Sequence, residues 1–150
     1  MDICKYLTSS GVDFELTLHE HVFTAQEVAA SEHVTGHIFA KTVIVRVAGR
    51  FHMLVLPGSR HVDMHKVADL LGGEPEMATE AEMKQLFEDC EIGAEPPFGS
   101  RYGINTLLDE SLMAVPHIVF RAGNHEHTVK MALEDYAKLE GPAVGDFTIE

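Results

Sequence analysis

The chain has 150 residues, of which 45% are hydrophobic and 23% charged, and these proportions are typical of a folded globular protein. We expect a single domain over residues 1–150. No apolar run approaches the ~20 residues that a membrane-spanning helix needs, so we expect no membrane association. The formal net charge of −13 disfavours broad binding to DNA or RNA, because phosphate contacts need a basic face.

The charge is distributed unevenly along the chain. Basic residues outnumber acids between Lys41 and Lys66, whereas acids outnumber basic residues between Glu74 and Glu95. An acidic protein with a basic middle can hold the end of an RNA chain but cannot easily wrap around one. The N-terminal segment lacks the pattern of a signal peptide, and two cysteines cannot form a disulfide framework. These features predict a cytoplasmic protein.

The first half of the chain predicts short helices and strands in alternation. Helices are expected over residues 3–10, from a capping box at 24–27 to about 33, and over 64–71 after the N-cap Asp63. Residues 14–18 alternate apolar and polar side chains, as a half-buried strand does. Residues 43–47 are nearly all apolar and β-branched, which predicts a strand buried on both faces. Gly49-Arg50 then predicts a hairpin into a strand over 51–56.

The second half of the chain predicts more strands and two further helices. The helices are expected from a capping box at 79–82 to about 87 and over 133–139. Strands are expected near 102–108, over 117–121 and over 127–131, with a turn at 109–111 and a tail from Gly141. Prolines make 93–99 a stiff loop, because proline lacks a backbone donor and fixes its own φ. The intermixed elements favour an α+β domain on a mixed, mainly antiparallel sheet.

Two stretches are candidates for chemistry. Lys41 places an ammonium group at the start of the buried strand, followed by Thr42, although a solvated lysine at a strand end is the alternative interpretation. The stiff loop from Gly93 to Pro97 can hold backbone N–H groups in a fixed direction, as an oxyanion hole requires. An ordinary proline-rich turn is the alternative for this loop.

Other catalytic patterns are weak. The ten histidines include four closely spaced pairs, His19–His21, His33–His37, His61–His65 and His125–His127. None of these pairs forms a zinc signature or lies beside clustered cysteines, so we expect surface imidazoles, no metal and no cofactor. Cys90 has acidic neighbours, which oppose a reactive thiolate. The chain also lacks a Gly-x-Ser-x-Gly nucleophile elbow.

An ordered series of short motifs is more specific than any single pattern. In chain order the motifs are Thr24 after His21, Ala40-Lys41-Thr42, Leu56-Pro57-Gly58 with Val62-Asp63, Ala78-Thr79-Glu80-Ala81-Glu82, Gly93-Ala94-Glu95-Pro96-Pro97-Phe98-Gly99, Asp109-Glu110-Ser111-Leu112 and Ala122-Gly123-Asn124-His125. Together they resemble the YbaK/EbsC family, the domain also found inserted in bacterial prolyl-tRNA synthetases and as free-standing aminoacyl-tRNA deacylases. The resemblance runs from about Gly11 to Ala137.

The resemblance implies a fold, a reaction and a set of site residues. The fold is a mixed sheet, curved around a small pocket and flanked by helices, and the reaction is hydrolysis of the ester that joins a wrong amino acid to a tRNA 3′ end. Lys41 matches the family's key lysine, Gly93 and Pro97 match its Gly-x-x-x-Pro loop, and His125 matches a histidine near the aminoacyl pocket. The other substrate-binding positions are Thr42, Ala94, Phe98, Gly99 and Gly123, with His19 and His21 where some members carry a tyrosine.

The implied chemistry agrees with these residue types, because an aminoacyl ester is already activated and needs no protein nucleophile. Water, helped by the ribose 2′-hydroxyl, attacks the carbonyl carbon. Lys41 holds the terminal phosphate or the developing negative charge, and the loop amides hold the oxyanion. Phe98 and Met53 are candidate walls of a pocket that selects by size, with core packing as the alternative.

Two other functions stay open at this point. A non-catalytic module of the same fold would bind a tRNA 3′ end or a small ligand, and the net charge of −13 favours it because fast capture of RNA needs positive charge. A metal-dependent hydrolase would use the histidine pairs. The expected partners are the aminoacyl-tRNA 3′ end and, to locate the tRNA, an aminoacyl-tRNA synthetase.

Overall fold

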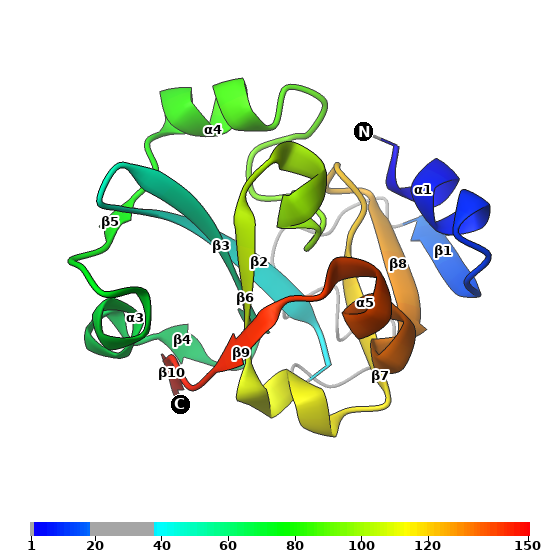
Figure 1. Cartoon of the computed structure of the whole chain (residues 1–150). Coiled ribbons are helices and arrows are strands. Elements are labelled where there is room, and N and C mark those ends of the chain that lie inside the picture. The colour runs from blue at the N-terminus through cyan, green and yellow to red at the C-terminus, as the bar shows by residue number, and fades with distance from the viewer. Residues whose placement is uncertain (1, 19–37) are drawn as a thin grey trace.

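Strands β2 (Ala40–Val47) and β3 (Arg50–Pro57) form a hairpin at the centre of the fold, in a computed structural model that describes residues 2–18 and 38–150 (Figure 1). The strands pair antiparallel along their whole length, from Ala40 opposite Pro57 to Val47 opposite Arg50. Ala48 and Gly49 connect them with φ values of 50° and 79°, as a two-residue type I′ turn requires. The predicted hairpin is confirmed.

A five-stranded mixed sheet is built around this hairpin, in the order β5-β2-β3-β6-β9. β5 (Glu76–Met77) pairs antiparallel with β2, whereas β6 (Asn105–Asp109) and β9 (Ala143–Gly145) extend the sheet in parallel. Successive side chains point to opposite faces of a strand. Accordingly, Ile44 packs into one hydrophobic core and Val45 into a second. The prediction of a strand buried on both faces is therefore confirmed.

A second, three-stranded antiparallel sheet contains β1 (Phe14–Leu18), β8 (His127–Ala132) and β7 (His117–Arg121), in that order. A parallel bridge between Phe39 and Val119 joins it to the five-stranded sheet, with the Val119 N–H donating to the Ile38 carbonyl at 2.9 Å. Figure 1 shows the three-stranded sheet on one side of the β2–β3 hairpin. The mixed, mainly antiparallel α+β architecture predicted from the sequence is confirmed, with its strands divided between these sheets.

Four α-helices flank the sheets, and their ends follow the capping residues in the sequence. They are α1 (Ile3–Ser9), α3 (Met64–Leu71), α4 (Glu80–Leu86) and α5 (Leu133–Glu140) among the described residues. The Asp63 carboxylate accepts from the first turn of α3, and Thr79 and Glu82 form the predicted capping box of α4. The helix expected over 24–33 lies outside the described residues. No helix of the described chain is long and apolar enough to cross a membrane.

Two local predictions were wrong at their boundaries. The strand expected from residue 102 begins only at Asn105, because η1 (Gly99–Tyr102) forms a 3₁₀ turn that ends at left-handed Gly103. Residues 109–111 form no simple turn, since Asp109 caps the 3₁₀ helix η2 (Glu110–Ala114) by accepting from the Ser111 N–H. Left-handed Gly103 and the Asp109 carboxylate each stabilise a short helical turn beside a strand.

The tail predicted from Gly141 is also wrong, because the C-terminal residues pair with the rest of the fold. β9 joins the five-stranded sheet, and β10 (Thr148–Ile149) pairs with β4 (His61–Val62). Phe147, between the two strands, is fully buried in the second hydrophobic core, and its N–H donates to the Asp109 carboxylate at 3.1 Å. Strands this short carry too little alternation to be identified from sequence.

Phe147→Ala should lower the free energy of unfolding by about 3–5 kcal/mol, because it removes a buried ring and leaves a cavity. Ile149→Ala is the matched control, since Ile149 is 46% exposed and should change stability far less. Urea unfolding followed by circular dichroism measures both variants. Equal small losses would contradict a packed C-terminus.

Candidate active site

Three segments that are far apart in the sequence meet at one small cavity. They are the start of β2, the irregular loop between α4 and η1, and the end of β7. The cavity has a volume of about 30 Å³ and is lined by Phe39, Ala40, Lys41, Thr42, Gly93, Glu95 and Arg121. The predicted residues Lys41, Thr42 and Gly93 therefore come together, although they lie up to 52 positions apart (93 − 41).

The pairing of β7 with the start of β2 explains why Lys41 and Arg121 line the same cavity. Phe39 and Val119 form the parallel bridge, and Lys41 and Arg121 each follow their bridged residue by two positions. Because side chains in a strand repeat every second residue, the two cationic side chains lie on the same side of the paired segments. This arrangement puts two positive charges at one point of an acidic protein.

Lys41 is half-buried, and no hydrogen bond or ion pair joins its ammonium group to another residue within ranges 2–18 and 38–150. Burial lowers the pKa of Lys41, because partial removal from water disfavours the charged form. The structure therefore places Lys41 in the cavity wall rather than in the fully solvated position of the alternative interpretation. A cation in this setting attracts an anion more strongly than one in bulk water.

The amides of the predicted oxyanion loop are partly occupied by the protein itself. The Gly93 N–H donates to Glu95 Oε1 at 3.0 Å, and the Ala94 N–H donates to the Glu91 carbonyl at 3.0 Å. Pro96 and Pro97 have no N–H to offer. Gly93 has a φ of 85°, which glycine adopts without strain. A substrate oxygen can bind the Gly93 N–H only after the Glu95 carboxylate leaves it.

The turn between β7 and β8 forms hydrogen bonds with this loop. The Glu91 N–H donates to the Gly123 carbonyl at 2.8 Å, and the Gly123 N–H donates to the Ala94 carbonyl at 2.9 Å. The His125 ring donates from Nε2 to the Ile92 carbonyl at 2.7 Å. Gly123, Ala94 and His125 thus lie together as a support for Gly93, next to the Lys41 cavity rather than in its wall.

The remaining predicted loop residues face the hydrophobic core. The Pro97 carbonyl accepts from the Tyr136 hydroxyl at 2.6 Å. Phe98 is fully buried, with its ring edge-to-face against Phe120 and Tyr136. Met53 is also fully buried, so both residues are placed as the core-packing alternative describes.

Gly99 serves packing at the end of the same loop. A Cβ at Gly99 would lie 2.5 Å from Thr106 Oγ1, a distance at which neighbouring atoms must shift. Its N–H donates to that same oxygen at 3.0 Å. The predicted positions His19 and His21 lie outside the described residues.

Sequence reasoning missed the two charged residues Glu95 and Arg121 of the cavity, as well as the apolar Phe39 and Ala40. Glu95 is only 4% exposed, and its carboxylate lies 3.5 Å from the Thr42 hydroxyl as well as beside Gly93. Arg121 Nη1 donates to the Gly93 carbonyl at 3.4 Å. The sequence could have indicated Glu95, because it is the one acid among the apolar and glycine residues of the 93–99 motif. Arg121 can be placed only from the pairing of β7 with β2.

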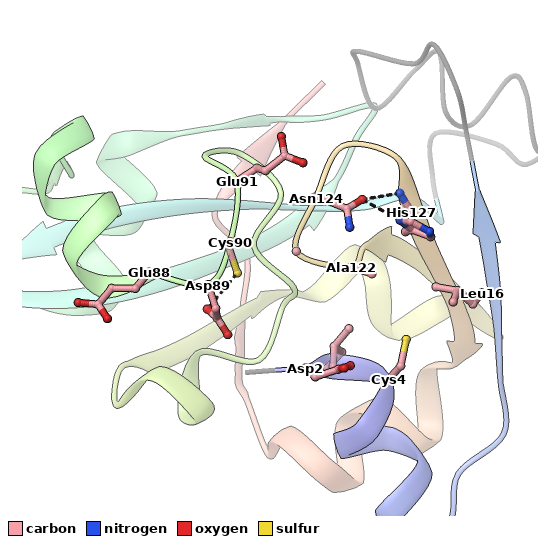
Figure 2. Close-up of a pocket in the computed structure, with 12 residues that line it drawn as sticks. Asp2, Cys4, Leu16, Glu88, Asp89, Cys90, Glu91, Ala122, Asn124 and His127 are labelled. Atoms are coloured by element: carbon pink, nitrogen blue, oxygen red, sulfur yellow. Dashed lines mark hydrogen bonds between the residues drawn. The ribbon is translucent and has the colours of Figure 1, made fainter.

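A larger cavity of about 660 Å³ lies on the other side of the same loop and turn, next to the start of α1. Figure 2 shows Glu88, Asp89 and Glu91 on the loop that carries Cys90, with Asn124 on the neighbouring turn. These acids repel an anionic ligand, whereas the Lys41 cavity contains two cationic side chains. Burial and the nearby Glu95 raise the pKa of the Cys90 thiol, as expected for a packed cysteine.

The described histidines have separate local contacts. Asp63 caps α3, so His61 lies in β4 outside the helix that carries His65. His127 Nδ1 lies 3.0 Å from Asn124 Oδ1, whereas the His125 ring contacts Ile92. No three His, Cys, Asp or Glu side chains gather as a metal-ligand group in the part of the chain that the structure describes.

Comparison with known families identifies the chain. Residues 19–139 match the aminoacyl-tRNA editing domain family, and this match covers most of the sequence. The protein belongs to the aminoacyl-tRNA editing domain family. The cavity at Lys41, the Gly93 loop and the 121–125 turn all lie within the matched residues. No curated protein matches the chain.

Solved structures share the fold at low sequence identity. A candidate trans-editing enzyme for prolyl tRNA synthetase matches with a TM-score of 0.89 and 21% identity, over 99% of this chain and 96% of the other. A hypothetical protein, APE2540, matches with a TM-score of 0.89 and 20% identity over 99% and 100% of the two chains. A signal-transduction candidate from Marinobacter aquaeolei VT8 matches with a TM-score of 0.76 and 13% identity, over 99% of this chain but 30% of its own.

Lys41→Met should raise the free energy of unfolding at pH 7. With the folded-state pKa of Lys41 lowered by burial, the unfolded chain binds the proton more tightly, so stability increases as pH rises through the lowered pKa. At pH 7 the folded protein therefore carries the cost of a partly desolvated charge, which methionine removes. Lys138→Met is the control, since the Lys138 side chain is 71% exposed. Chemical denaturation measures both, and a less stable Lys41→Met protein would contradict the desolvation.

Proposed function

We propose that this protein is a free-standing aminoacyl-tRNA deacylase, which hydrolyses the ester of mischarged tRNA in trans. The observation that carries the proposal is the meeting of Lys41, Gly93 and Arg121 at one cavity, in a chain of the aminoacyl-tRNA editing domain family. The proposed substrate is a soluble aminoacyl-tRNA. The proposal therefore includes action in the cytoplasm. An aminoacyl-tRNA synthetase is the proposed partner that brings the tRNA.

In the proposed reaction, water attacks the ester carbonyl carbon and the ribose oxygen leaves with a proton. Lys41, with Arg121 beside it, supplies positive charge for the terminal phosphate or for the developing oxyanion. The Gly93 N–H donates to the carbonyl oxygen once the Glu95 carboxylate has released it. The ribose 2′-hydroxyl of the substrate helps to orient the water. These roles need no protein nucleophile, because the aminoacyl ester is already activated.

The proposed substrates carry small or mis-selected amino acids such as alanine, cysteine or serine. This choice follows from membership of the aminoacyl-tRNA editing domain family. A pocket that admits only small side chains discriminates by exclusion, as the second sieve of an editing system does.

A binding module without turnover is the second candidate function. It is favoured by the occupied amides of the loop, since the Gly93 and Ala94 N–H groups already donate within the protein. Such a module would hold the tRNA 3′ end at Lys41 without polarising the ester carbonyl.

Lys41→Ala should lower the deacylation rate by about 10²–10³-fold, the usual effect of losing one preorganised charge-stabilising group. The measurement uses tRNAs charged with alanine, cysteine, serine and proline, with wild type and Lys41→Ala assayed in parallel. Lys138→Ala controls for loss of an exposed positive charge. Hydrolysis by Lys41→Ala at the wild-type rate would refute the proposed role of Lys41. Binding of the tRNA end without hydrolysis of any ester would favour the second candidate.

A further inference from the structure

The Glu95 carboxylate occupies an unusual position for an acid. It is 4% exposed and lies in the wall of the cavity that contains Lys41 and Arg121. Burial of a carboxylate is costly unless hydrogen bonds or opposite charges compensate it. A leucine or valine at this position of the loop would avoid that cost. An acid at this buried position is therefore a candidate for a role in binding or chemistry.

The hydrogen bonds of Glu95 leave part of its accepting capacity unused. Oε1 accepts from the Gly93 N–H at 3.0 Å, and Oε2 lies 3.5 Å from the Thr42 hydroxyl. An ionised carboxylate offers about four acceptor positions. Lys41 lines the same cavity, yet no ion pair joins it to Glu95 in the described structure. The carboxylate can thus accept a further donor from a molecule in the cavity.

An aminoacyl ester carries the complementary groups. Its carbonyl oxygen is an acceptor, its α-ammonium group is a cationic donor, and only three bonds separate them. The Gly93 N–H and Glu95 Oε1 form an adjacent donor and acceptor, 3.0 Å apart. A substrate that inserts between them replaces one protein–protein hydrogen bond with two protein–substrate bonds. The carbonyl oxygen accepts a hydrogen bond from the Gly93 N–H, and the ammonium group donates one to the Glu95 carboxylate.

We propose that Glu95 binds the α-ammonium group of the aminoacyl ester, and this inference rests on the proposed deacylase function. The same contact releases the Gly93 N–H for the carbonyl oxygen, so amine recognition and oxyanion binding occur together. A tRNA whose amino acid is N-acylated, as in peptidyl-tRNA, lacks the positive charge. It would leave the buried carboxylate unpaired, and a site built for a polar group rejects a ligand that lacks its partner. Glu95 therefore restricts the site to free aminoacyl esters.

Glu95→Gln tests this role with little change of shape. The glutamine Oε1 can still accept from the Gly93 N–H, and its amide can donate to the Thr42 hydroxyl. Only the negative charge is lost. The substrates are alanyl-tRNA and N-acetyl-alanyl-tRNA, assayed for kcat/KM with wild type and variant. Glu88→Gln is the matched control, because Glu88 lines the larger cavity and not the one at Lys41.

Wild type should hydrolyse the free form preferentially. Glu95→Gln should lower kcat/KM for alanyl-tRNA by about 10- to 100-fold, the range of a charge-assisted hydrogen bond. The kcat/KM for N-acetyl-alanyl-tRNA should not fall and should rise where the unpaired carboxylate had excluded it, because glutamine leaves no buried charge without a partner. An equal loss on both substrates would overturn the proposal, because a general base or a purely structural acid acts on both alike. An unchanged rate on both would also overturn it. Near-ultraviolet circular dichroism verifies that the variant is folded.

A binding measurement separates this inference from the deacylase proposal. If wild type hydrolyses neither these two substrates nor the cysteinyl-, seryl- and prolyl-tRNA of the panel, the deacylase proposal fails, and the role of Glu95 is then decided with non-hydrolysable 3′-alanylamino-adenosine. Wild type should bind this amide analogue more tightly than its N-acetyl derivative, and Glu95→Gln should abolish the difference. Equal affinities of wild type for the two analogues would overturn the ammonium contact.

Discussion

The hydrogen bond from the Val119 N–H to the Ile38 carbonyl, at the parallel bridge between Phe39 and Val119, connects the three-stranded sheet to the five-stranded sheet. The position of Lys41 beside Arg121 depends on this contact, because each residue lies two positions beyond the bridge. The turn that follows Arg121 then brings Gly123 to Ala94, and so supports the loop that carries Gly93. A candidate active site thus arises where strands of different sheets meet.

Electrostatics distinguishes this site from the rest of the acidic surface. The chain has a formal net charge of −13, and the larger cavity next to α1 is lined by Asp2, Glu88, Asp89 and Glu91. The Lys41 cavity combines two cations with the single buried carboxylate of Glu95. Such a site fits the proposed substrate, the end of a tRNA with one phosphate and one ammonium group, better than the length of an RNA chain. In the proposed function, the acidic surface repels the length of an RNA chain, and Lys41 and Arg121 attract a phosphate at its end. Together these two effects favour recognition of the tRNA end.

The sequence was sufficient for elements with strong local signals and insufficient for contacts set by tertiary pairing. The β2–β3 hairpin, the Asp63 cap and the Thr79–Glu82 capping box follow from turn and cap chemistry that acts within a few residues. β9 and β10 were missed because strands of two or three residues have no measurable period. Lys41, Thr42 and Gly93 were predicted from motifs and line the cavity, whereas Arg121 enters the site only through the bridge between sheets.

The central claim is that the start of β2, the Gly93 loop and the 121–125 turn form a single binding site for the aminoacylated tRNA end. Amide chemical shifts of the ¹⁵N-labelled protein, titrated with 3′-alanylamino-adenosine, test this claim directly. The account predicts that Lys41, Gly93 and Arg121 shift together with one dissociation constant, while Asp2 and Glu88 at the larger cavity stay unchanged. Shifts confined to the larger cavity, with Lys41 and Gly93 unmoved, would contradict it.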